Sequence, residues 1–290
     1  MRRSVRLPPA WLMLAPSLLL LTVFTYGPVI QVLLRSLEVR RFGRPVVHGL
    51  ANYAALLGDE RFTRALSNTA LYAAGTIIPS LTLALLFALA VRDAGWLSSA
   101  VRTLLVLPMM VPLVAAAALF TFIFLPGAGL IDHYLGWLGL AGVNWLGDPD
   151  LALPSIVAVT VWKNTGYYML FFLAGLAAVP EELLDAARLD GANAWQRLRH
   201  VILPLLGPTF GFVSVIAVVN VLVQVDHVLV MTGGGPADST NLLLSYIYQT
   251  AQQNLDVGRA SAATAVSVAG LFALAGFSLH ALERGIHYES

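Results

Sequence analysis

Long apolar stretches alternate with short polar segments along nearly the whole chain. A helix needs about 20 mostly apolar residues to cross a hydrocarbon core of roughly 30 Å. Six stretches meet this requirement: Trp11–Leu34, Thr69–Val91, Val101–Leu125, Leu153–Ala178, Leu205–Val230 and Ala260–Leu282. The pattern predicts an all-α membrane protein with six transmembrane helices, forming one transmembrane domain over residues 1–290.

The polar segment between the fourth and fifth stretches, residues 179–204, has a helical pattern of its own. Pro180 suits a first helical turn, and the acidic residues after it complement the positive end of a helix dipole. Asp190-Gly191 ends this helix, because glycine accepts the left-handed conformation of a helix C-terminus. A second short helix is expected over Ala192–His200. The segment therefore predicts a helix–turn–helix at the membrane surface.

The charges of this segment favour a protein partner over lipid. A helix that rests on headgroups is usually rich in Lys and Arg. The first helix here carries Glu181, Glu182, Asp185 and Asp190 against Arg188 alone, and anionic lipid would repel that set. The second helix has Arg197 and Arg199 and could still touch headgroups. Residue Trp195 adds an aromatic contact.

Composition narrows the function further. The chain is 58% hydrophobic and 11% charged, against about 25% charged residues in a soluble domain. Its net charge of +1 gives no reason to expect a nucleic-acid partner, and it contains no cysteine. No nucleophile–base pair, metal-ligand set or G-x-x-x-x-G-K-[ST] phosphate loop is present. We expect no catalytic residues, no metal and no cofactor on this chain.

Charge alone indicates the orientation only weakly. With both ends cytoplasmic, nine arginines fall in inside segments and seven in outside segments. The predicted outer loop Pro126–Ala152 has no Lys or Arg, which fits an outside position. The first outer loop is basic, and it is long enough for an interfacial helix around Asn52–Asn68.

Polar side chains inside the fourth and fifth stretches are candidates for a solute pathway. Ionisable residues within spans are costly and point to function. Asn220, Gln224 and His227 follow helical spacing and predict one polar stripe on the fifth span. The alternative for each residue is structural: snorkelling, a Lys163–Asp226 pair, or hydrogen bonds between helices. The candidates are Lys163, Asn164, Tyr167, Asn220, Gln224, Asp226 and His227.

The segment 179–204 resembles the cytoplasmic EAA loop of permease subunits from bacterial ATP-binding-cassette importers. That pattern is E-A-A, a Gly four residues later, and a terminal I-x-L-P. Here it reads Asp185-Ala186-Ala187, Gly191 and Val201-Ile202-Leu203-Pro204. Asp185 stands for Glu and Val201 for Ile, and the shorter acid changes the geometry of the expected contact.

Further motifs resemble the sugar-type members of that family. They are Trp162–Tyr168 through Pro180 in the fourth span, Thr232–Pro236 with Thr240 and Tyr246–Tyr248 after the fifth span, and Gly49–Tyr53 with Asn68-Thr69 before the second. The resemblance implies a maltose- or glycerol-3-phosphate-type permease in the bacterial inner membrane. It implies coupling to an ATPase through Glu181, Glu182, Asp185, Ala186, Ala187, Asp190, Gly191 and Trp195.

The resemblance also implies partners: a second homologous permease, two ATP-binding subunits, an extracytoplasmic solute-binding protein and membrane lipid. The solute would be a sugar or a related polar molecule, with glycerol-3-phosphate or a polyol as the alternative. An ion-gradient-driven secondary transporter is the competing class, although no paired inverted repeats are visible. A membrane scaffold without a solute path is a third.

Overall fold

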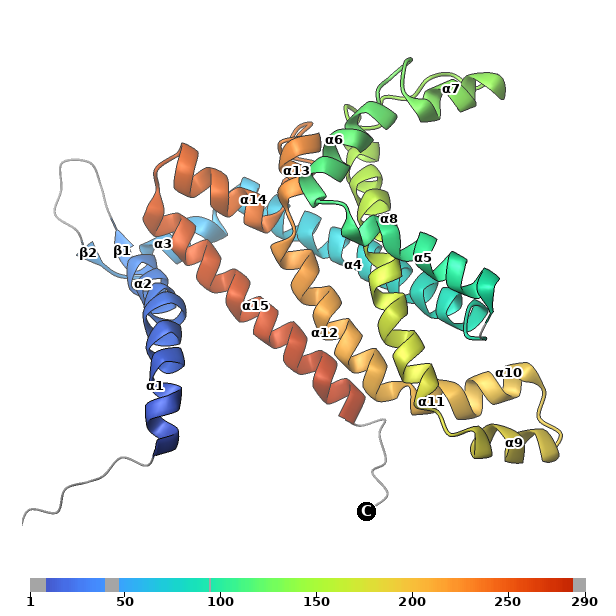
Figure 1. Cartoon of the computed structure of the whole chain (residues 1–290). Helices are drawn as coiled ribbons and strands as arrows, with labels where there is room; N and C mark the ends of the chain where they lie inside the picture. The colour runs from blue at the N-terminus through green and yellow to red at the C-terminus, as the bar shows by residue number, and fades with distance from the viewer. Residues whose placement is uncertain (1–8, 40–46, 94, 284–290) are drawn as a thin grey trace, which may run out of the picture. The chain divides into compact units, whose positions relative to one another are not determined.

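The computed structural model describes residues 9–39, 47–93 and 95–283, and most of these are helical (Figure 1). The chain divides into two compact units. One comprises residues 1–60 and 247–268, and the other comprises residues 61–246 and 269–290. The prediction of a helical protein with several apolar helices is confirmed.

The smaller unit begins with a continuous helix made of α1 (Pro9–Leu21), a π-helical turn Thr22–Tyr26 and α2 (Gly27–Ser36). Strands β1 (Glu38–Val39) and β2 (Val47–His48) form an antiparallel pair, and α3 (Ala51–Leu57) follows. Asn52 ties this region together, because its amide donates to the carbonyls of Ser36 and Glu38, both at 2.9 Å. A π-helical turn Gln249–Gln253 and the first part of α15 (Val257–Glu283) complete the unit.

The larger unit contains the long helices α4 (Glu60–Ala90), α8 (Pro149–Ala177) and α12 (Gly207–Val223). Between them lie α5 (Trp96–Met110), α6 (Leu113–Ile123), α7 (Leu130–Trp137) and α9 (Glu181–Leu189). After α9 come α10 (Ala194–Arg197), a π-helical turn Leu198–Ile202 and α11 (Leu203–Leu205); α13 (Asp226–Met231) and α14 (Leu243–Tyr248) follow α12. Helices α5 and α12 pack on α8, and α6 packs on α13.

Two glycines set how closely the helices of this unit approach. A Cβ at Gly166 would lie 1.8 Å from the backbone oxygen of Leu105, so α5 and α8 touch there backbone to backbone. A Cβ at Gly175 would lie 2.5 Å from the Thr209 hydroxyl, which marks the contact of α8 with α12. Small residues allow such approach between membrane helices. Both crossings fix the position of α8.

The predicted boundaries need several corrections. The expected helix at Asn52–Asn68 is wrong: α3 ends before Gly58, and residues 60–68 are the first turns of α4. The span predicted over Val101–Leu125 is not one straight helix, because α5 and α6 meet at 98°. Pro112 has no N–H and disfavours helical geometry at Val111, whose backbone is extended. Helix α8 begins at Pro149, where the Asp148 side chain accepts from the Asp150 N–H.

Length and composition support part of the predicted span count. Among the described residues, Met13–Ser36, Glu60–Ala90 and Gly207–Met231 are long and apolar enough to cross a membrane. The bent pair α5–α6 makes a fourth if it is counted as one span, and Val257–Ala273 is a shorter apolar helix. The count of six stays a prediction.

Candidate functional site

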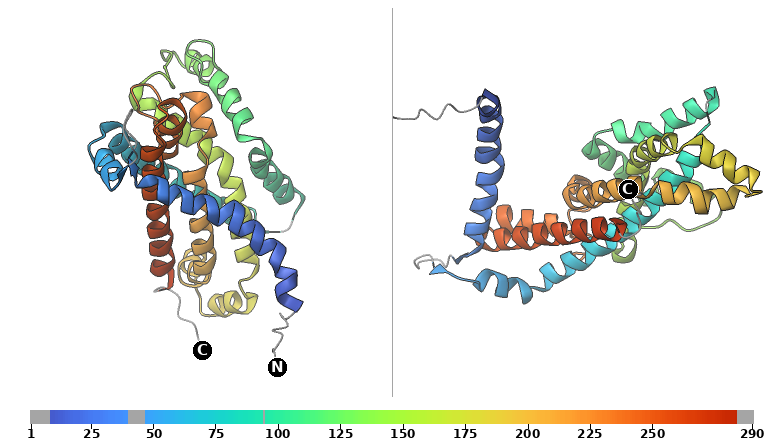
Figure 2. Two further views of the ribbon diagram at one scale, coloured as in Figure 1. Left: turned by 90° about the vertical axis from the view of Figure 1, so that its left-hand side faces the viewer. Right: turned by 90° about the horizontal axis from the view of Figure 1, so that it is seen from below.

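The segment from Pro180 to Leu206, which we call the elbow, joins the ends of α8 and α12. Figures 1 and 2 show α9 and α10 running side by side at the end of α8 opposite to α7. Pro180 precedes α9 in extended geometry as its N-cap, one residue earlier than predicted. Glu181 and Glu182 occupy the first turn, as the dipole argument expects.

Leu184 fixes α9 to the rest of the unit. It is 6% exposed and belongs to a buried apolar cluster. The cluster also includes Leu176 and Val179 at the end of α8, Ile202 in the π-helical turn after α10, and Leu206 before α12. Leu184 therefore connects α9 by packing to the ends of both long helices.

The turn of the elbow depends on Gly191, which has φ +79°. Side chains other than Asn and Asp rarely adopt this left-handed region, so the predicted role of the glycine in ending α9 is confirmed. The second helix begins at Ala194 and not at Ala192 as predicted. Asn193 caps it, since its side chain accepts from the Gln196 N–H at 2.9 Å while the Gln196 side chain accepts from the Asn193 N–H.

The outer face of the elbow is acidic and apolar at the same time. Leu189 is 90% exposed and Trp195 is 63% exposed, although both side chains are apolar. Asp185 forms an exposed ion pair with Arg188 at 2.7 Å. Of the eight predicted coupling residues, Ala187 is half-buried and the others are exposed: Glu181, Glu182, Asp185, Ala186, Asp190, Gly191 and Trp195. This face is available to a partner.

Lys163 lies far from the elbow, at the break between α5 and α6. It is 8% exposed, and its amine donates to the carbonyls of Pro108, Met109 and Val111. These carbonyls belong to the last turn of α5, where Pro112 prevents the helix from continuing. Lys163 thus satisfies a broken helix end. The suggested pair with Asp226 does not occur among the described residues, and Asp226 is exposed at the start of α13.

The amides of the candidate set pair between α8 and the end of α12. Asn164 donates to Gln224 at 3.4 Å, and Asn220 donates to the Tyr168 hydroxyl at 3.2 Å. The predicted stripe on one continuous helix is wrong. Helix α12 ends at Val223, and Gln224 and Val225 separate it from α13. Tyr167 is half-buried and stacks edge-on against Phe171.

His227 belongs to a separate, fully buried cluster. Its Nε2 lies 3.0 Å from the hydroxyls of both Tyr72 and Thr160, so the cluster joins α4, α8 and α13. Sequence reasoning missed Tyr72 and Thr160. A signal existed on α4, because Tyr72, Thr76 and Ser80 recur every four residues within an apolar span. The seven pathway candidates therefore occupy several places and not one pocket.

Two loops at the other end of α8 are held by side-chain hydrogen bonds and an ion pair. In the loop after α13, Asp238 pairs with Arg61 at 2.9 Å and its carbonyl accepts from Asn68. In the predicted outer loop, Asp132 accepts from the Gly127 N–H at 2.8 Å and from the Trp145 indole at 3.0 Å. These donors, Gly127 first, lower the pKa of Asp132 below its usual range.

Comparison with known proteins agrees with this geometry. The family described as "Binding-protein-dependent transport system inner membrane component" matches residues 80–288. The sn-glycerol-3-phosphate transport system permease protein UgpA of Agrobacterium fabrum is 33% identical over 287 residues, covering 96% of each chain. The probable starch degradation products transport system permease protein AmyD of Thermoanaerobacterium thermosulfurigenes is 31% identical over 257 residues, covering 87% of each.

Among solved structures, a chain of a bacterial ABC transporter involved in the import of the acidic polysaccharide alginate superposes with a TM-score of 0.84. It is 25% identical, and the match covers 95% of both chains.

Proposed function

Because this chain belongs to the family of binding-protein-dependent transport system inner membrane components, we propose that it is the permease subunit of an ATP-driven importer for a sugar or related polar solute. Family membership places the chain in the inner membrane as a transport component. The proposal adds the energy source, the elbow as the coupling element, and the class of solute.

The observation that carries the proposal is the construction of the elbow. One face is seated in the bundle by Leu184, and the other presents acids together with Leu189 and Trp195 to the surroundings. Exposed apolar side chains gathered on one face mark interaction sites, and aromatic residues such as Trp195 are enriched at protein interfaces. The partner we propose is an ATP-binding subunit, because this chain lacks a phosphate loop of its own.

The remaining architecture follows from the same proposal. Six spans cross the membrane, with the elbow and both chain ends on the cytoplasmic side. The chain works with a second homologous permease, two ATP-binding subunits and an extracytoplasmic solute-binding protein, and it holds no cofactor itself. The loops at 126–148 and 232–241 then lie outside, within reach of the binding protein.

The solute class rests on the relatives. The two relatives are named as permeases for sn-glycerol-3-phosphate and for starch degradation products. Both are hydroxyl-rich, and a solute of this kind needs hydrogen bonds to replace those of water. We propose that polar groups near the α8–α12 contact, including Tyr167, Asn164 and Gln224, supply them when the helices separate. In the resting arrangement two of these groups bond to each other.

Coupling proceeds mechanically in this proposal. Closure of the ATP-bound partner subunits displaces α9, and Leu184 passes the displacement to the ends of α8 and α12. Because Gly175 brings these two helices into close contact, they move together. The pairs between Asn164 and Gln224 and between Asn220 and Tyr168 then part or re-form as the bundle opens to one side or the other.

A pair of substitutions at Gly191 tests the coupling. Proline requires φ near −65°, so Gly191→Pro cannot keep the turn, whereas Gly191→Asn can, since asparagine tolerates the left-handed region. In proteoliposomes containing the whole complex, we expect Gly191→Pro to insert normally and to lose solute uptake per ATP hydrolysed. Gly191→Asn should retain most of it. Normal uptake by Gly191→Pro, or uptake driven by an ion gradient without ATP, would contradict the proposal.

A further inference from the structure

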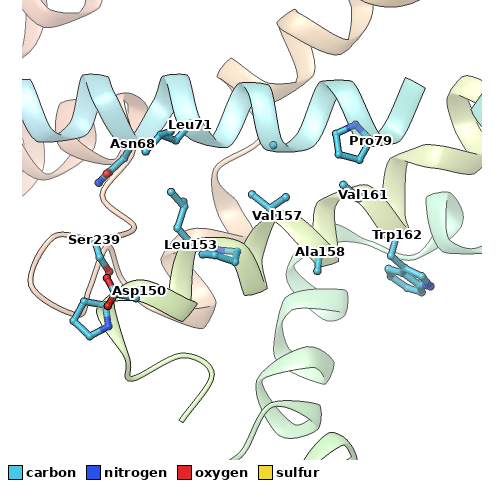
Figure 3. A pocket seen from close by; sticks show the side chains of 13 residues that line it. Asn68, Leu71, Pro79, Asp150, Leu153, Val157, Ala158, Val161, Trp162 and Ser239 are labelled. Carbon is cyan, nitrogen blue, oxygen red and sulfur yellow. The ribbon is translucent and has the colours of Figure 1, made fainter. Parts of the chain in front are cut away.

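An apolar groove runs along the outside of the larger unit between α4 and the first half of α8. Its volume is about 800 Å³, within the range of ligand pockets. Leu71, Gly75, Val157 and Val161 form its walls, and Pro79 and Trp162 lie at one end (Figure 3). None of the coupling residues of the elbow and none of the polar groups proposed for the solute lines this groove.

The groove has the length of one membrane leaflet. The groove extends over eleven helical steps of α4, from Asn68 to Pro79, and over twelve of α8, from Asp150 to Trp162. At 1.5 Å per residue its length is about 16 to 18 Å. Half of a hydrocarbon core is about 15 Å. A transmembrane helix of a partner would follow α4 and α8 through both leaflets. A single acyl chain of a lipid would end where this groove ends.

The other end of the groove is polar and offers acceptors. Asn68, Asp150 and Ser239 gather there (Figure 3). The side-chain N–H groups of Asn68 donate to the carbonyls of Asp238 and Asn241, so its amide oxygen remains as an acceptor for a ligand. The Oγ of Ser239 is buried and has no hydrogen-bond partner within the described chain. A buried hydroxyl without a partner is costly, so a polar ligand group that reaches it would be favoured.

We propose that this groove binds one phospholipid with a primary ammonium headgroup, of the phosphatidylethanolamine type. The ammonium has three N–H donors for the acceptors at the polar end, and Asp150 supplies the opposite charge. A quaternary choline headgroup has no N–H to donate, and an anionic glycerol headgroup would meet the Asp150 carboxylate. The acyl chain lies between α4 and α8. Assignment to the outer leaflet rests on the proposed cytoplasmic elbow, but the binding itself does not.

Arg64 lies beside the polar end of the groove and is not one of the residues that line it. It lies four residues before Asn68, on the same face of α4, and its guanidinium donates to the carbonyl of Ala237, two residues before Ser239. A guanidinium has further N–H donors in its planar fork, and these suit the lipid phosphodiester. Asp150 at the polar end and Arg64 beside it thus offer opposite charges to the ammonium and the phosphate of one headgroup.

The test is lipid retention by the whole importer complex, reconstituted in vesicles of equal parts phosphatidylethanolamine, phosphatidylcholine and phosphatidylglycerol. After mild detergent extraction, bound lipids are counted by mass spectrometry, without ATP or solute. We expect the wild type to retain phosphatidylethanolamine about fivefold above its share, as one additional charge contact allows. This readout is independent of transport, so its failure leaves the proposed function standing, and loss of ATP-driven uptake leaves this inference standing.

Three variants sharpen the result. Ala158→Phe fills the groove and should remove the retained lipid, whereas Ala118→Phe, an equally exposed alanine on α6 outside the groove, should not. Asp150→Asn should retain lipid but lose the preference for phosphatidylethanolamine. The proposal is overturned if Ala158→Phe and wild type retain the same lipid, or if the preference survives in Asp150→Asn. A cross-link from position 158 to a partner permease would also overturn it.

Discussion

Leu184 offers a quantitative test of how the elbow transmits force. Leu184→Ala removes three carbon groups from a site that is 6% exposed. Each buried CH₂ contributes about 0.8 kcal/mol, and the residual cavity raises the total to about 2–5 kcal/mol. A loss of about 2 kcal/mol shifts the equilibrium between seated and released α9 by roughly 30-fold toward release. The acidic and apolar outer face is unchanged.

Leu183 provides the matched control, because it is the neighbouring residue on α9 and is 46% exposed. Leu183→Ala removes the same atoms from a position that is about half exposed. The assay compares solute uptake with ATP hydrolysis in proteoliposomes, and it records how much ATP-binding subunit co-purifies. We expect Leu184→Ala to retain the partner and to lower uptake per ATP severalfold, while Leu183→Ala complexes keep the wild-type ratio. Equal ratios for the two variants would refute transmission through Leu184.

Three further predictions concern the bundle and its outer loop. Lys163→Met leaves the carbonyls of Pro108, Met109 and Val111 without their donor. This should lower the free energy of unfolding by about 1–3 kcal/mol and lower the apparent melting temperature of the purified complex. An unchanged melting temperature would contradict the capping role of Lys163. Gly166→Ala places a methyl group against the Leu105 carbonyl and should prevent stable assembly of the complex. At Gly270 an added methyl group would meet nothing within 4 Å, so Gly270→Ala should be neutral. Size-exclusion profiles of the two variants check both expectations. Because the pKa of Asp132 is lowered in the folded protein, its stabilising effect is present above the ordinary pKa of 3.8 and is lost as the pH falls through the lowered pKa. The fluorescence of Trp145 should therefore change in that acidic range in the wild type but not in Asp132→Asn.

The sequence predicted the positions of the helices well where hydropathy controls them. Helix α8 was expected from Leu153 and begins at Pro149, and α15 was expected from Ala260 and begins at Val257. The elbow was also predictable, since charged residues in an apolar chain and a glycine at a helix end both have local physical causes.

The breaks within spans were not predictable in the same way. Membrane helices tolerate proline when neighbouring groups satisfy the freed carbonyls, so Pro112 by itself could not distinguish a kink from a break. The break is accompanied by the hydrogen bond from Lys163 to the carbonyl of Val111, and these two residues lie 52 positions apart in the sequence. The stripe of Asn220, Gln224 and His227 failed for a related reason, because it assumed a helix that stops at Val223.

The central claim is that the elbow meets an ATP-binding subunit on the cytoplasmic side. Photo-cross-linking from position 189 tests it most directly, because Leu189 is 90% exposed at the tip of α9. A photoreactive residue at Leu140, which is 56% exposed in the loop after α7, serves as the comparison. The account predicts a cross-link from position 189 to the ATP-binding subunit and none from position 140. A cross-link to that subunit from position 140, with none from 189, would contradict it.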